Sequence, residues 1–122
     1  MNATVIKNLI KVTKAALTDN IYMSTRISDN EELGWKRSDN ELLSFERMQM
    51  LEKMFGKSVL NPVIYNQGMP EDWTHVEYMR MWRFVLRIMR MRKCKMVAFQ
   101  EDLIGSIGCR EEITLGLPTT IL

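Results

Sequence analysis

The stretch YMRMWRFVLRIMRMRKCK, residues 78–95, has the pattern on which the predicted fold depends. At 100° per residue, apolar side chains cover well over half of a helix drawn through it. Four arginines at spacings of three, four and three form one stripe, the arginine ridge: Arg80, Arg83, Arg87 and Arg90. An apolar helix with one polar ridge is typical of a core helix. We therefore predict a long central helix over about 70–93, with Pro70 in its first turn.

Two other segments show the same helical periodicity, residues 3–17 and residues 39–55. The second has a predicted capping box between Ser38 and Glu41, and Gly56 is placed to end it. Residues 18–37 are irregular, and the C-terminal residues look like an extended tail. The sequence thus predicts a mainly α fold, a compact helical bundle forming a single helical domain over residues 1–122. Its three to four helices would be about 3–17, 39–55, 70–93 and, as an additional helix, 96–107.

The composition fits a globular chain in a reducing compartment. The sequence has 122 residues, of which 46% are hydrophobic and 26% charged. No apolar run approaches the roughly 18 residues needed to span a bilayer. Two cysteines cannot form a disulfide framework, and the N-terminus lacks the pattern of a secretory signal. We expect an intracellular, cytoplasmic protein, with a nuclear location left open.

The usual catalytic and metal-binding patterns are missing from the sequence. His75 is the single histidine, and Cys94 would lie about 28 Å from it along a continuous helix. The cysteine and histidine spacings do not fit a zinc site. Carboxylates that are adjacent in sequence point about 100° apart on a helix, so they should not converge on one substrate. These pairs are Glu31–Glu32, Glu71–Asp72, Glu101–Asp102 and Glu111–Glu112. The sequence predicts a non-enzymatic protein without catalytic residues, metal or cofactor.

Positive charge is concentrated in one segment of a chain whose net charge is only +2. From Val76 to Lys95 there are seven basic residues and one acidic residue, Glu77. The ridge is either a solvated helix edge or a binding surface, since the arginine fork suits carboxylates and phosphates. We predict a protein-binding module, such as an adaptor, regulator or virus-type accessory protein, that grips an acidic protein partner. The predicted site combines the arginine ridge with Met79, Trp35, Lys36 and Arg37.

Two alternatives to this function remain open, and we also expect self-association. The same ridge could bind nucleic acid through phosphates. The segment 3–17 could instead bind an anionic membrane surface through Lys7, Lys11 and Lys14. Helices that are apolar over much of their surface, together with eleven methionines, also favour a homo-oligomer.

Overall fold

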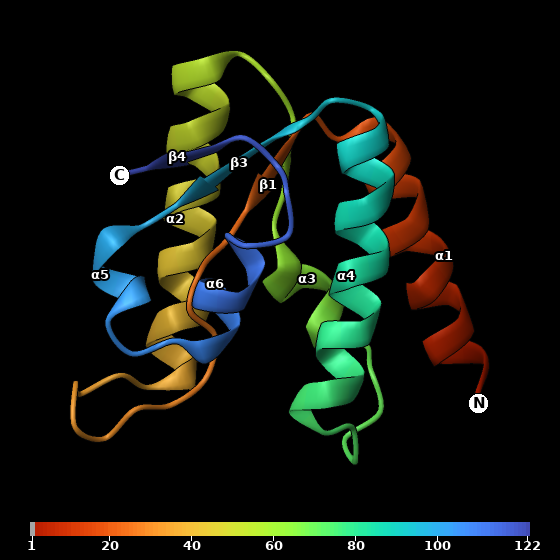
Figure 1. Ribbon diagram of the computed structural model, residues 1–122. Helices are drawn as coiled ribbons and strands as arrows, with labels where there is room; N and C mark the ends of the chain where they lie inside the picture. The colour runs from red at the N-terminus through yellow and green to blue at the C-terminus, as the bar shows by residue number, and fades with distance from the viewer. Residues whose placement is uncertain (1) are drawn as a thin grey trace.

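The computed structural model describes residues 2–122 and contains a parallel β-sheet flanked by helices (Figure 1). The sheet has four strands in the order β2-β1-β3-β4, and every neighbouring pair is parallel. The strands are β1 (Ile21–Met23), β2 (Val59–Leu60), β3 (Lys95–Ala98) and β4 (Thr119–Ile121). The prediction of a mainly α helical bundle is therefore wrong, and the fold is α/β.

Helices cover both faces of this sheet. They are α1 (Ala3–Thr18), α2 (Arg37–Phe55), α3 (Pro62–Asn66), α4 (His75–Met91), α5 (Gln100–Leu103) and α6 (Ile107–Glu112). Figure 1 shows α1 and α4 together on one side of the strands and α2 on the other. Each side has its own apolar core, one built on α1 and α4 and one on α2. This layered arrangement is that of an open, doubly wound α/β fold.

The strands β1 and β2 escaped prediction because they are short and buried on both faces. In β1, Ile21 and Met23 belong to the α2 core with Leu51, whereas Tyr22 belongs to the α1–α4 core with Trp82. Both faces of a parallel sheet are covered, so its strands read as apolar runs without alternation. A run of three such residues cannot be distinguished by periodicity from a piece of helix.

The three long helices were predicted, although not all of their ends were. Helices α1 and α2 agree closely with the predicted 3–17 and 39–55, and Gly56 ends α2 in the left-handed conformation with φ 62°. The capping box predicted at the start of α2 is wrong, because its N-cap is Lys36 and makes no side-chain bond. A capping box instead begins α4, where Thr74 pairs with Glu77. This helix therefore begins at His75 rather than at Pro70.

The remaining segments differ more from prediction. The additional helix over 96–107 is wrong, because this range contains most of β3 and all of α5. The predicted extended tail contains α6 as well as β4, and the irregular segment 18–37 contains β1. Among residues 2–122, no helix is both long and apolar enough to cross a membrane.

Candidate active site

A cavity lies at the edge of the sheet where the strands end. Parallel strands all end at the same edge of the sheet. From this edge, the chain continues from β1 to its neighbour β2 on one side, and from β3 to its neighbour β4 on the other side. Ligands of doubly wound sheets bind in the crevice at such a switch point. The cavity has a volume of about 560 Å³, within the range of small-molecule sites. Its walls come from β1 and the loop after it, from α3, from the first half of α4 and from α6.

Aromatic rings form much of the cavity wall. All three tryptophans of the chain line it, Trp35, Trp73 and Trp82, together with Tyr22 and Tyr78. Edge-to-face contacts join Tyr22 to Trp82 at a centroid distance of 5.9 Å and Trp73 to Tyr78 at 5.4 Å. Such pairs are favourable by about 0.5–1.5 kcal/mol beyond their buried apolar area, which holds these rings in place. The wall is therefore largely preformed for a ligand with apolar surface.

A buried carboxyl group, that of Glu112, also lies in this wall. Glu112 is the last residue of α6 and is only 6% exposed. The Tyr22 hydroxyl donates a hydrogen bond to its Oε2, and the Ser24 hydroxyl donates to its Oε1 at 3.0 Å. Tyr22 and Ser24 are themselves fully buried in and just after β1. Both carboxylate oxygens are thus held in a fixed orientation beside the cavity.

The surroundings of Glu112 bring its ionisation close to neutral pH. Burial raises the pKa of this carboxyl to about 7, and the charge of Glu111 adds to the increase. The hydrogen bonds from Tyr22 and Ser24 act in the opposite direction, because they stabilise the ionised form. Burial, together with the negative charge of Glu112, raises the pKa of Tyr22 well above 10, so the phenol stays a hydrogen-bond donor.

A second reactive group in the wall, the thiol of Cys109, is held in its neutral form. Burial, followed by the charge of Glu112, raises the pKa of Cys109 to about 12. The thiolate is the nucleophilic form of cysteine, so this thiol is unreactive near neutral pH. Within residues 2–122 no three histidine, cysteine or carboxylate side chains come together as a metal site. Glu112 is therefore the group in this cavity that is best suited to chemistry.

Two charged or titratable residues that line the cavity, His75 and Arg26, pair with carboxylates beside it. His75 Nε2 lies 3.4 Å from Glu111 Oε1, which brings the start of α4 near α6. Arg26 stacks on Trp35 at 4.5 Å from the ring centroid, and its guanidinium lies 3.1 Å from Asp102. These contacts fix the loop that follows β1 against the segment that follows β3.

No family model, curated protein or solved structure matches this chain. Function therefore has to be inferred from the cavity and from the groups that line it.

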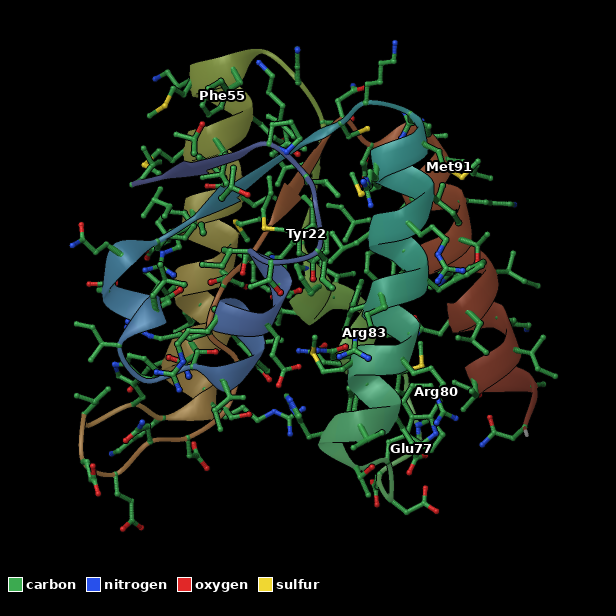
Figure 2. The ribbon with its side chains drawn as sticks, viewed as in Figure 1. Tyr22, Phe55, Glu77, Arg80, Arg83 and Met91 are labelled. Atoms are coloured by element: carbon green, nitrogen blue, oxygen red, sulfur yellow. The ribbon has the colours of Figure 1, made fainter. Side chains whose placement is uncertain are left out.

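The predicted binding residues separate into two regions. Trp35, Arg37 and Met79 line the cavity, and Lys36 is exposed next to them. Met79 is only 6% exposed, so it does not contribute to an external docking surface. The arginine ridge is exposed along the outer side of α4, as Figure 2 shows for Arg80 and Arg83. The cavity and the ridge are thus separate features of the same helix.

The three residues that define the carboxyl site were not singled out from the sequence. As an adjacent pair, Glu111 and Glu112 do not suggest a site, whereas the partners of Glu112 in the fold, Tyr22 and Ser24, lie 90 and 88 residues away in the sequence. The available signal was the alternation of helices with short apolar runs that end in polar residues. Ile21–Met23 is followed by Ser24, and Met96–Phe99 is followed by Gln100. Such runs predict a parallel sheet with polar groups along its carboxyl edge.

Proposed function

We propose that the protein is an enzyme whose substrate is a small organic molecule bound in the cavity, with the Glu112 carboxyl as its acid–base group. The observation that supports this most directly is the buried carboxyl, held by two hydroxyls in the wall of a cavity at the switch point of the sheet. Strongly shifted carboxyls in such crevices are candidates for catalytic groups. This proposal departs from the non-enzymatic role expected from the sequence.

The position of Glu112 suits proton transfer. A general acid or base works best when its pKa is close to the working pH, and burial brings Glu112 to about 7. Each carboxylate oxygen accepts one hydroxyl hydrogen bond, which leaves a lone pair for a substrate or its proton. Because Tyr22 and Ser24 fix the carboxyl, little reorganisation is needed when the proton moves.

The tryptophans provide a direct way to test ligand binding and turnover. Since all three line the cavity, a bound compound should change the intrinsic fluorescence. Compounds that do so are then incubated with the wild type, with Glu112→Gln and with the control Glu46→Gln, and followed by mass spectrometry. Glu46 is an exposed glutamate on α2, so its variant undergoes the same chemical change far from the cavity. We expect the wild type and the control to convert at least one compound that Glu112→Gln leaves unchanged.

Two results would contradict the proposal. One is turnover by Glu112→Gln at the rate of the wild type, which would remove the carboxyl from the chemistry. The other is that compounds bind, as measured by fluorescence, but the wild type converts none of them at pH values around 7. This result would favour a binding protein.

The hydroxyl of Tyr22 should set the pH at which the reaction runs. Its hydrogen bond lowers the pKa of Glu112, so Tyr22→Phe should raise that pKa. The transition of the pH–rate profile that reports Glu112 is then expected at higher pH than in the wild type. A profile that loses amplitude without moving would instead indicate that Tyr22 acts on the substrate or only supports the fold.

A further inference from the structure

We propose that the outer face of α1 and α4 docks on an anionic phospholipid bilayer, with apolar side chains inserted and cations on the headgroups. This surface is distinct from the cavity and does not depend on the function proposed for Glu112. It combines two features that lie in different segments of the sequence, the lysines of residues 3–17 and the arginine ridge.

The two helices lie side by side and run in the same direction (Figure 1). Their C-terminal ends are tied together by Arg92, whose Nη1 donates to the carbonyl oxygens of Ala16 and Asp19 at 2.7 and 2.6 Å. Their inner sides fill the core above the sheet, where Val12 of α1 and Val85 of α4 are buried. Their outer sides are consequently presented together at one surface.

Large apolar side chains project from this surface without any covering element. The exposed fractions are 46% for Ile6, 50% for Ile10 and 54% for Leu17 on α1, and 52% for Phe84 and 79% for Met91 on α4. The α1 residues recur at spacings of four and seven, and Phe84 and Met91 are seven apart, so each set forms one stripe. Figure 2 shows Met91 on the side of α4 that is turned toward α1. Exposed apolar groups on neighbouring helices mark an interaction surface.

Cations border both stripes. Lys7, Lys11 and Lys14 lie beside the α1 stripe, and Arg80, Arg83 and Arg87 lie beside the α4 stripe. None of these six makes an ion pair within residues 2–122. Helix α1 has no acidic residue, and the acidic residue of α4 is the partly buried Glu77 of its capping box. Apolar stripes flanked by lysine and arginine are the pattern of helices that lie in a membrane interface.

A bilayer fits this surface better than a second copy or a helix of another protein. A two-fold dimer through the face would place its six cations opposite like charges. The hollow on this side is lined by α1 alone, at Ile6, Leu9, Ile10, Thr13 and Lys14. It therefore does not form the groove between two helices in which a partner helix would be seated. Projecting apolar side chains with no deep groove suit insertion into lipid.

Vesicle sedimentation tests the proposal on the whole protein. The wild type should sediment with vesicles of phosphatidylcholine and phosphatidylserine, and not with vesicles of phosphatidylcholine alone. The double variant Arg83→Glu/Arg87→Glu should bind the anionic vesicles about a hundredfold more weakly, because two attractive charges become repulsive. Phe84→Ser/Met91→Ser should weaken binding by about tenfold or more through the loss of insertion.

The matched control is Lys53→Glu/Lys57→Glu, which makes the same change of charge at the exposed C-terminal end of α2 and just after it. It should keep wild-type binding, and so should Glu112→Gln. If the control loses as much binding as Arg83→Glu/Arg87→Glu, net charge alone attracts the protein to the vesicles. If the wild type binds neutral and anionic vesicles equally, the cations have no role in binding. Either result overturns the proposal, as does a wild type that ignores anionic vesicles at low salt. Thermal unfolding of each variant establishes that lost binding is not lost folding.

Discussion

Replacing Glu112 with glutamine should abolish most activity and, above pH 7, make the protein more stable than the wild type. Loss of a general acid–base group lowers kcat by about a hundredfold to ten-thousandfold. Glutamine keeps the size of the side chain, can accept from Ser24 and can donate to Tyr22, so the wall of the cavity is preserved. The gain in stability arises because glutamine never ionises.

The pH dependence of this gain follows from the pKa of Glu112, about 7 in the folded protein and 4.5 for an ordinary glutamate. Below pH 4.5 the carboxyl is protonated in both states and does not oppose folding. As pH rises toward 7, the unfolded chain ionises first, so the free energy of unfolding falls; above 7 the loss is complete, at about 3 kcal/mol. Urea unfolding of wild type and variant should agree near pH 4 and diverge by that amount near pH 8.

The control Glu46→Gln should follow the wild type at both pH values, because Glu46 is exposed. A Glu112→Gln protein that is less stable than the wild type at both pH values would contradict the expectation. Lower stability at pH 8 would show that the ionised carboxyl is stabilised in the fold, and lower stability already at pH 4 would show that the amide does not replace the protonated carboxyl in its hydrogen bonds.

Asp102→Asn should destabilise the protein by about 3–5 kcal/mol, because it removes the buried counter-ion of Arg47 and leaves this buried cation with only the exposed carboxylate of Glu101. Asp102 is fully buried, and Arg47, which is 6% exposed, donates to its Oδ2 at 2.5 Å. Arg26 donates to the same carboxylate from Nη1 at 3.1 Å and from its backbone nitrogen at 3.0 Å. Asparagine removes the negative charge and turns an amide group toward one of the guanidinium groups. Urea unfolding at neutral pH measures the loss.

Glu101→Gln provides a matched comparison within the same cluster. Glu101 also pairs with Arg26 and Arg47, at 3.1 and 2.5 Å, but its side chain is 61% exposed. Ion pairs with an exposed partner contribute about 0–1 kcal/mol, so this variant should be nearly as stable as the wild type. If both variants lost the same amount, burial would not be what determines the strength of this cluster.

The long helices were predictable because their evidence is local. Val5, Leu9 and Val12 of α1 recur at helical spacing, and the glycine that ends α2 adopts the left-handed conformation. The sheet was not predictable in the same way. Its strands have two to four residues, and Ile21 pairs with Val59 and Lys95, far away in the sequence.

The candidate site was hidden for the same reason. A buried glutamate in the pair Glu111–Glu112 looks like any solvated pair until the hydroxyls of Tyr22 and Ser24 are brought to it by the fold. The sequence did identify Trp35, Arg37 and Met79, which line the cavity, but for a different role. Aromatic and basic residues stand out by type, whereas the environment that raises a carboxyl pKa exists only in three dimensions.

The position of β1 has a consequence for how the chain folds. This strand comes early in the sequence yet lies inside the sheet, between β2 and β3. Its parallel partners are non-local, and sheets with such contacts fold slowly because long loops must close first. After Val59–Leu60 is available to one edge of Ile21–Met23, the other edge therefore remains unpaired and open to contacts with other chains until Lys95–Ala98 has been synthesised. Conditions that slow synthesis after residue 60 should lower the soluble yield more than conditions that slow it earlier.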